Sequence, residues 1–262
     1  MSQTFTPVLT IAASDGCGGA GIQADLKTFA AFRCYGLSAV TAVTAQNTRG
    51  ITEIHSLPPR VLEKQLQALA EDFQFTAIKI GMIYSRENIE VVAEFIQSYA
   101  SRWVVLDPIF QSSSGTPLLE EDARELFKEV LLPLANVITP NWPEAENLFK
   151  VTNFRELMRM LPGLPYHIFL TGGHLQEPFV ADVLLQLPES LHEFRHERLQ
   201  TTNTHGTGCT LSSALTACLA LGMPLLDAAR AASEYTYGAL KAARNLRLGR
   251  GNGPLHHFYK DW

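Results

Sequence analysis

Short apolar runs alternate with amphipathic stretches along most of the chain, and this alternation restricts the fold more than any other feature. The stretch around Ile89, Val92, Ala93 and Ile96 carries its apolar residues at helical spacing. Such a pattern is typical of parallel strands that are each followed by a crossover helix. The sequence therefore predicts an α/β fold, with strands at 8–13, 38–44, 77–82, 103–107, 136–140, 167–171 and 181–187.

The second half ends differently, because two helices rich in small residues follow one another from Gly206 onward. We expect them at 208–221 and 224–245, with Pro224 opening the second. A length of 262 residues is normal for one α/β sheet with its helices. The break at 161–165 is too short and too apolar to be a linker, so residues 1–262 are expected to form a single domain.

Composition narrows the class of partner. Hydrophobic residues make up 46% of the chain and charged residues 18%, which is typical of a soluble globular protein. The net charge is −5 and Lys and Arg are scattered, so we expect a small-molecule ligand, with no nucleic-acid and no membrane partner. The four cysteines form no CxxC pair and no zinc-like spacing, and no leader segment is seen. A reducing, cytoplasmic location is expected.

One glycine-rich segment, Ser14–Gly21, follows the first predicted strand and opens a helix. Glycines at such a turn allow the backbone to approach a ligand and leave amides free at the helix N-terminus. The run from Gly16 to Gly21 also fits the G-x-G-x-x-G pattern of dinucleotide sites, but no acidic residue follows about 20 positions later to hold a ribose. A plain strand-to-helix turn is the alternative.

A second glycine-rich segment, Thr204–Thr210, also runs into an apolar helix. The amides of Gly206, Thr207 and Gly208 are expected to form an anion hole for a transferring phosphoryl group. Cys209 falls in the first helical turn, where a thiol pKa tends to be lowered, so a thiolate could accept a proton from a substrate hydroxyl. A buried structural cysteine is the alternative.

Asn141 and Glu144 stand three residues apart where a strand ends and a helix begins. Ligands of open parallel sheets gather at this edge, so the two oxygen-bearing side chains could orient waters around Mg²⁺. The same spacing is that of a helix N-cap with a capping glutamate. The two interpretations are compatible.

Taken together, these segments resemble the hydroxymethylpyrimidine/phosphomethylpyrimidine kinases over nearly the whole chain. The matching motifs are Ala12–Asp15, Gly18–Thr28, Ala45–Thr48, Lys79–Met82, Thr139–Asn141 with Glu144, Gly172–His174, Asn203–Thr210 and Gly253–Phe258. The resemblance implies a ribokinase-like three-layer αβα sandwich with a central, mostly parallel sheet. It also implies transfer of phosphate from ATP, with Mg²⁺, to 4-amino-5-hydroxymethyl-2-methylpyrimidine and then to its monophosphate, in thiamine diphosphate biosynthesis.

The resemblance further implies roles for single residues. On the substrate side, Asp25 and Gln46 would hydrogen-bond the aminopyrimidine, and Ala13, Ala20, Met82 and Ile109 would line its pocket. Gly206, Thr207 and Gly208 would be the anion hole, with Cys209 as the proton acceptor. On the nucleotide side the resemblance points to Asp107, Asn141, Thr171, Gly172, Gly173 and His174, with Asp107, Asn141 and Glu144 near the metal.

The chain departs from the family pattern where relatives usually carry two lysines. Thr171 stands before the paired glycines, and Ser113–Ser114–Gly115 replaces Lys-Ser-Gly, so we predict weaker nucleotide binding than in relatives that keep both. A pyridoxal or pyridoxine kinase of the same superfamily is one alternative. A catalytically weakened pyrimidine-binding protein is another. A homodimer is the expected assembly.

Overall fold

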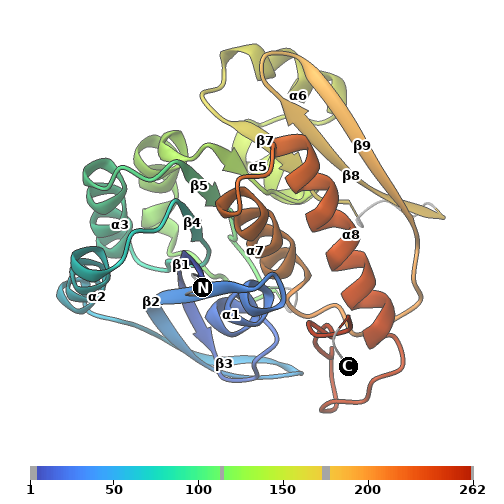
Figure 1. The fold of residues 1–262 in the computed structure, drawn as a ribbon, viewed down its shortest axis with the longest axis horizontal. Coiled ribbons are helices and arrows are strands. Elements are labelled where there is room, and N and C mark those ends of the chain that lie inside the picture. Colours follow the sequence, from blue (N-terminus) through green and yellow to red (C-terminus); the bar gives the residue numbers. More distant parts are fainter. Residues whose placement is uncertain (1–4, 113–114, 173–177, 261–262) are drawn as a thin grey trace, which may run out of the picture.

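A single nine-stranded sheet forms the centre of the computed structural model, which describes residues 5–112, 115–172 and 178–260 (Figure 1). Its strand order is β3-β2-β1-β4-β5-β6-β7-β8-β9. Neighbours from β2 to β7 pair in parallel, whereas β3, β8 and β9 pair antiparallel. The bounds are β1 Thr6–Asp15, β2 Cys34–Asn47, β3 Gly50–Ser56, β4 Ala77–Ile80, β5 Trp103–Leu106, β6 Val137–Ile138, β7 His167–Leu170, β8 Phe179–Gln186 and β9 Ser190–Glu197.

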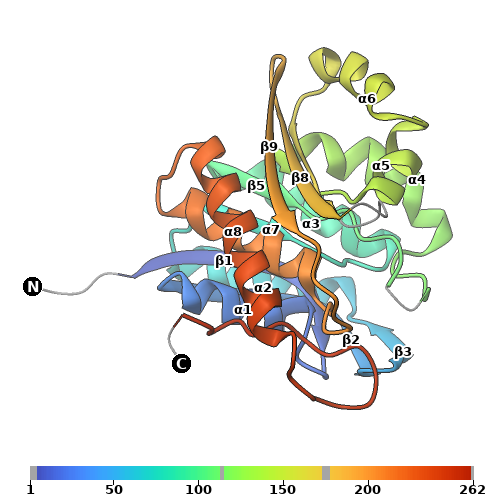
Figure 2. The same ribbon diagram turned by 90° about the vertical axis from the view of Figure 1, so that its right-hand side faces the viewer.

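Helices cover both faces of this sheet. One face carries α1 (Gly21–Ala31), α7 (Thr207–Ala220) and α8 (Leu225–Ala243). The other carries α2 (Pro59–Asp72), α3 (Arg86–Ser98), α4 (Arg124–Leu126), α5 (Trp142–Phe149) and α6 (Phe154–Met160), with short 3₁₀ or π turns at 121–123, 127–134 and 161–163. Figures 1 and 2 show the two layers, with β3 at one end of the sheet and the β8–β9 hairpin at the other.

The alternation of side chains along each strand supplies both cores. Val105 belongs to the buried cluster that contains Leu211 and Leu215 of α7, whereas its neighbour Leu106 belongs to the cluster that contains Ile89 of α3 on the opposite face. Successive strand side chains point to opposite faces, so a continuous apolar run serves two helix layers at once. The predicted three-layer αβα sandwich is confirmed.

All seven predicted strands are present, and the structure adds β3 and β9. Both extra strands lie at edges of the sheet and alternate exposed and half-buried residues, so neither has the apolar run that marks a buried strand. The predicted terminal helices are confirmed within one or two residues. Arg33 lies just beyond the end of α1, with a left-handed φ of 59°.

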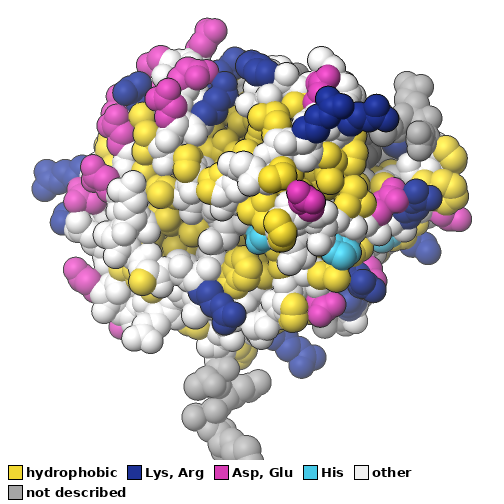
Figure 3. Space-filling model, turned by 90° about the horizontal axis from the view of Figure 1, so that it is seen from above, with side chains coloured by type: hydrophobic (Ala, Val, Ile, Leu, Met, Phe, Trp, Pro, Cys, Tyr) yellow, Lys and Arg dark blue, Asp and Glu magenta, His cyan; other side chains and the backbone are white. Residues whose placement is uncertain are grey.

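This topology brings the carboxyl ends of the six strands β1, β2 and β4 to β7 to one edge of the sheet, where α7 begins. Open parallel sheets bind ligands at this edge. On the face seen in Figure 3, Lys and Arg side chains lie scattered among Asp and Glu. None of the helices in the described ranges combines the length and the apolarity needed to span a bilayer.

Candidate active site

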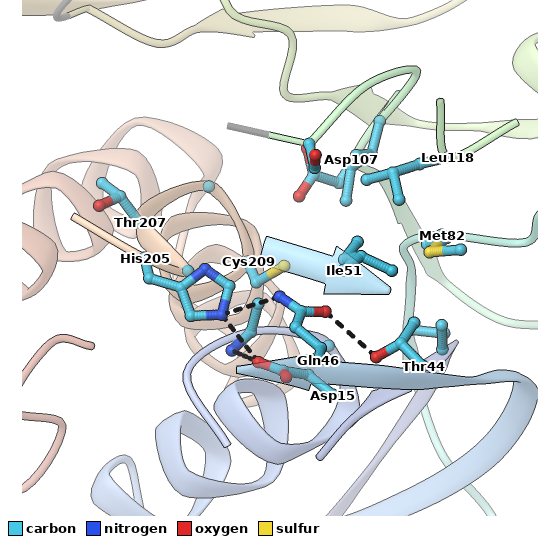
Figure 4. Close-up of a pocket in the computed structure, with 18 of the residues that line it drawn as sticks. Asp15, Thr44, Gln46, Ile51, Met82, Asp107, Leu118, His205, Thr207 and Cys209 are labelled. Atoms are coloured by element: carbon cyan, nitrogen blue, oxygen red, sulfur yellow. Dashed lines mark hydrogen bonds and ion pairs between the residues drawn. The ribbon is translucent and has the colours of Figure 1, made fainter. Parts of the chain in front are cut away.

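A cavity of about 250 Å³ opens at the carboxyl ends of the strands (Figure 4). Five of the six predicted substrate residues line it, namely Ala13, Ala20, Gln46, Met82 and Ile109. Ile51 of β3 and Leu118 add further apolar surface. The cavity therefore combines an apolar lining with a few polar groups, as small-molecule sites do.

The loop between β1 and α1 is organised around the carboxylate of Asp15. Its Oδ1 accepts the Cys17 N–H at 2.8 Å, and its Oδ2 accepts the N–H groups of Gly19 and Ala20 at 3.0 and 2.9 Å. The Gly18 N–H goes to the Asp15 backbone carbonyl at 2.9 Å. The expectation of free amides in this loop is therefore wrong for these four residues, since an internal carboxylate and carbonyl accept them.

The glycines of this loop allow close packing against the second glycine-rich segment. A Cβ on Gly206 would overlap the Gly19 carbonyl oxygen, and a Cβ on Gly19 would overlap the His205 ring. Gly206 also has a φ of +84°, a left-handed conformation that favours glycine. The two segments thus touch backbone to backbone beside the cavity, which explains the glycine spacing without a dinucleotide.

His205 joins the two segments at the cavity wall (Figure 4). Its Nε2 lies 2.8 Å from Asp15 Oδ2 and 3.3 Å from Gln46 Nε2. Burial by itself raises the pKa of Asp15, but the hydrogen bonds from His205, Ala20 and Cys17 outweigh it, and the net shift is downward. Asp15 is therefore a stable negative charge beside the ring that Gln46 also contacts.

Asp25, the sixth predicted substrate residue, does not reach the cavity. Its side chain is 0% exposed, and the Lys79 Nζ lies 3.0 Å from both carboxylate oxygens. The hydroxyls of Thr10 and Ser213 donate to the same carboxylate at 2.6 Å each. The oxygens of Asp25 thus accept hydrogen bonds from three buried groups, and this geometry gives no support to the predicted contact with the pyrimidine.

Lys79 is fully buried on β4 and completes this ion pair. Burial lowers the pKa of a lysine, but the carboxylate of Asp25, with smaller contributions from Cys209 and Asp107, raises it above the ordinary value. The ammonium is therefore a permanent positive charge at the wall of the small cavity, which Lys79 helps to line.

Cys209 lines the cavity and is 7% exposed, on the first turn of α7. Burial raises its pKa to about 12, and Lys79 only partly counteracts this. The predicted lowering of the pKa at the helix N-terminus is therefore wrong for this state of the protein, because desolvation of the thiolate outweighs the favourable helix end. The residue is a thiol at neutral pH.

Residues near the end of the chain, among them Gly253 and His257, contact the turn before α7 and fix its position. Thr210 Oγ1 donates to the Gly206 carbonyl at 2.8 Å and lies 3.0 Å from His257 Nε2. The His205 N–H donates to the Gly253 carbonyl at 3.0 Å, and the Asn203 amide donates to the carbonyls of Ala243 and Leu246. Residues far along the chain thus fix the segment that faces the cavity.

A second, larger cavity of about 1100 Å³ adjoins the first. Both cavities are lined by Gln111, Ser112, Asn141, Glu144, Thr171, Thr204, Thr207 and Gly208. The predicted anion hole thus lies at the junction, with Gly208 exposed. The Thr207 amide and hydroxyl both reach the Thr204 carbonyl, at 3.3 and 2.7 Å, and so close the turn.

Two carboxyl groups with raised pKa values face this junction. Burial raises the pKa of Asp107 to about 6, with Asp25 adding to the shift, although Lys79 and the hydroxyls of Ser212 and Thr139 counteract it. Burial, followed by the charge of Asp107, raises the pKa of Glu144 to about 8. A divalent cation relieves this situation, in which burial and a neighbouring carboxylate disfavour the charged form of a carboxyl group.

The Asn141–Glu144 pair forms the helix cap that its spacing also allowed. Asn141 Oδ1 accepts the Glu144 N–H and Glu144 Oε2 accepts the Asn141 N–H, both at 2.9 Å, at the start of α5. Each acceptor oxygen has two lone pairs, so capping leaves acceptor capacity on both side chains. The two side chains can therefore form the cap and still have lone pairs for a metal ion or its waters.

The predicted nucleotide residues Thr171 and Gly172, which follow β7, line the larger cavity. Thr171 donates its N–H to Pro140 O at 2.9 Å, and the Gly172 N–H goes to Asp182 Oδ1 at 2.9 Å. Gly172 has no room for a side chain because Ala181 of β8 packs against it. The remaining predicted positions on this side, Ser113, Ser114, Gly173 and His174, lie outside the described residues.

Several residues of the site were not assigned a role from the sequence. Asp15 and His205 stand inside the two glycine-rich segments, so their positions within those motifs were the available signal. Ile51 and Leu118 had no such signal, because β3 and the loop after β5 have no distinctive pattern. Thr44 ends a predicted strand, but its residue type alone did not indicate a place in the cavity.

Comparisons with known proteins agree with this geometry. A family model described as phosphomethylpyrimidine kinase matches residues 15–256. The chain is 42% identical to the hydroxymethylpyrimidine/phosphomethylpyrimidine kinase of Rhizobium meliloti (strain 1021), over 97% of this chain and 97% of that protein. It is 40% identical to the Escherichia coli (strain K12) protein of the same name, over 97% of this chain and 98% of that protein.

Among solved structures, the phosphomethylpyrimidine kinase of Clostridium difficile 630 superimposes with a TM-score of 0.79 at 38% identity, covering 90% of this chain and 99% of that one. The ADP complex of Bacillus subtilis pyridoxal kinase gives a TM-score of 0.87 at 32% identity, covering 97% and 98%. The fold is thus common to both kinds of kinase, whereas sequence identity is higher to the pyrimidine kinases. Because the family model matches residues 15–256 of the chain, this protein belongs to the phosphomethylpyrimidine kinase family.

Proposed function

We propose that this protein uses Mg-ATP to phosphorylate 4-amino-5-hydroxymethyl-2-methylpyrimidine and then its monophosphate to the diphosphate, in thiamine diphosphate biosynthesis. One observation carries the proposal. A small, largely apolar cavity and a larger one meet at the first turn of α7, where Thr207 and Gly208 line both. This is the arrangement that transfer of a phosphoryl group between two bound molecules needs.

The small cavity suits an aminopyrimidine. Met82, Ile109 and Leu118 offer apolar surface to a flat ring. Gln46 supplies an amide that can donate to a ring nitrogen and accept from an amino group. The neighbouring His205 and Asp15 fix the polar side of the pocket, and we assign these three residues to recognition in place of Asp25.

The larger cavity suits the nucleotide, with its phosphates directed at α7. Gly206 and Gly208 would receive the terminal phosphate at the positive end of the helix dipole. Asp107, Asn141 and Glu144 provide the oxygen ligands that Mg²⁺ prefers, directly or through water. A bound Mg²⁺ would supply charge neutralisation for the phosphates, and it would favour the ionised forms of the two carboxyl groups.

Cys209 is placed to contact the hydroxyl of the pyrimidine. Because the thiol is protonated at neutral pH in this state, we assign it first to positioning that hydroxyl against the phosphate. Phosphoryl transfer passes through a loose transition state, so alignment and charge neutralisation supply most of the rate. Asp107, with a pKa of about 6, is ionised at neutral pH and is the second candidate to accept the proton.

The test is an assay of purified protein with MgATP and hydroxymethylpyrimidine, in which products are followed to the mono- and diphosphate. Cys209→Ala is expected to lose turnover and to keep substrate binding, whereas Cys218→Ala, which alters a buried cysteine of the same helix away from the cavity, keeps both. Wild-type turnover in Cys209→Ala would remove this residue from the mechanism. Failure of the wild type to form pyrimidine-dependent ADP would leave a binding protein instead.

Pyridoxal is the second candidate substrate, because the chain shares its fold with pyridoxal kinases. An assay in which pyridoxal competes with the pyrimidine distinguishes the two. We expect the pyrimidine to have the higher kcat/KM. The reverse order would assign the protein to pyridoxal salvage.

We also propose a cytoplasmic homodimer. Edge strand β3 has one partner, β2, among the described strands, and Val43 of β2 is 46% exposed, so this end of the sheet offers backbone and apolar groups to a second copy. Sedimentation at micromolar concentration tests the assembly, and a monomer would contradict it.

A further inference from the structure

Three side chains of different chemistry converge beside the small cavity. Asp15, Cys17 and His205 each offer one ligand atom, and all three atoms lie within 4.8 Å of one another. Asp15 ends β1, Cys17 lies in the loop that follows, and His205 comes from the segment before α7. Figure 4 shows Asp15 and His205 side by side. A carboxylate oxygen, a thiol sulfur and an imidazole nitrogen are the donor set typical of Zn²⁺ and related ions.

The geometry suits a compact metal site. Ligand atoms around a tetrahedral Zn²⁺ lie about 3.5 Å apart, given bonds of about 2.0 to 2.3 Å. The Asp15–His205 pair now forms a hydrogen bond at 2.8 Å, so a bound cation would replace the shared proton, these two atoms would move slightly apart, and the Cys17 side chain would rotate toward them. The Asp15 side chain is 4% exposed and the His205 side chain 12%, so the site is largely shielded from water.

The supporting contacts hold two of the ligands in place. Asp15 is fixed by the backbone amides of Cys17, Gly19 and Ala20. His205 is held by its own backbone bond to Gly253 and by the packing of its ring on Gly19. Ligands fixed by surrounding contacts bind metal more tightly than free ones.

We propose that Asp15, Cys17 and His205 form a binding site for a thiophilic divalent cation, and that its occupation inhibits the enzyme. The site differs in chemistry from the oxygen-rich Asp107–Asn141–Glu144 cluster, so Mg²⁺ and Zn²⁺ would select different places. Three protein ligands leave the fourth position to water.

The inhibition follows from the position of the ligands. Asp15 and His205 line the small cavity, and His205 Nε2 is the atom that contacts Gln46. A cation on Nε2 removes this contact and places a charge at the polar side of the pocket. On the proposed function, Zn²⁺ is therefore expected to compete with the pyrimidine.

Metal binding can be measured without a kinase assay. Co²⁺ added to the protein is expected to give the near-ultraviolet thiolate charge-transfer band and the visible bands of a tetrahedral site. Cys17→Ser should abolish the thiolate band and weaken Zn²⁺ binding at least about tenfold in calorimetry. Cys34→Ser, which changes a buried cysteine at the start of β2, should retain both.

Two results would overturn the proposal. The first is a Co²⁺ spectrum that Cys17→Ser leaves unchanged. The second is loss of the thiolate band in Cys209→Ala, in which Cys17 is intact, because this result would assign the metal to the Cys209 thiol. In the kinase assay at buffered free Zn²⁺, the wild type should show a raised KM for the pyrimidine and Cys17→Ser should not. The Co²⁺ spectra test the metal site whether or not the pyrimidine is the substrate. Failure of the metal proposal can therefore be distinguished from failure of the proposed function.

Discussion

Replacing either member of the Asp25–Lys79 pair should destabilise the protein rather than weaken substrate binding. Both side chains are 0% exposed, and both carboxylate oxygens lie 3.0 Å from the ammonium. Removing one partner of such a pair leaves an uncompensated buried charge, at a cost of about 3–5 kcal/mol. For a chain of this size that cost corresponds to a fall in Tm on the order of 10 °C.

Thermal unfolding of Asp25→Asn, Lys79→Met and the double variant provides the assay. The double variant has no unpaired charge, so it should lose less stability than the two single changes added together, with a coupling of about 1–3 kcal/mol. Thr10 and Ser213 can still hydrogen-bond the asparagine, which limits the remaining loss.

Gln46→Ala serves as the matched contrast for Asp25→Asn. Gln46 lines the cavity and is only partly buried, so its replacement should raise the KM for the pyrimidine and leave Tm near the wild-type value. An Asp25→Asn variant with the wild-type Tm and a raised KM would refute the structural role and return Asp25 to the substrate.

Three further changes test other parts of the site. Gly206→Ala should abolish turnover, because the added Cβ would overlap the Gly19 carbonyl. Gly222 has a similar φ but open surroundings, so Gly222→Ala should only lower the stability, by about 1–2 kcal/mol. Equal turnover in the two variants would contradict this expectation. Burial, helped by nearby Lys27 and His256, lowers the pKa of His257 from 6.5 to about 4, so the unfolded chain binds more protons between these values. The contribution of His257 to stability should therefore fall by about 2 kcal/mol from pH 7 to pH 5. The raised pKa values of Asp107 and Glu144 act in the opposite direction, so the wild type is compared with His257→Gln in a denaturant series. The stability difference between the two proteins should change by this amount over that pH range, and a constant difference would contradict the assignment. Thr171→Lys should bind nucleotide more tightly in a titration, and an unchanged Kd would remove the idea that a cation is lacking there.

The sequence predicted the layers of the fold better than its edges. A parallel sheet needs apolar strands buried on both faces, and those runs are visible for every central strand. β3 and β9 have only one neighbour each in the described sheet and carry polar residues on their outer positions, so no apolar run marked them.

The candidate site was predicted in its location but not in its internal contacts. The glycine-rich segments indicated where backbone comes close to a ligand, yet the sequence could not show that Asp15 takes the loop amides. The burial of Asp25 has a signal in the sequence. Asp25 lies four residues before buried Phe29, and Lys79 stands between Ile78 and Ile80 in a buried strand, where an ammonium needs an anion.

The dependence of the α7 turn on the last residues of the chain has a consequence for synthesis. Gly253 and His257 support His205 and Thr210, so the ligand-facing loop cannot be completed until residues 253–257 have left the ribosome. A nascent chain in which all the described strands have formed would still lack this support, and changes at Gly253 or His257 would disturb the pocket before they disturb the sheet.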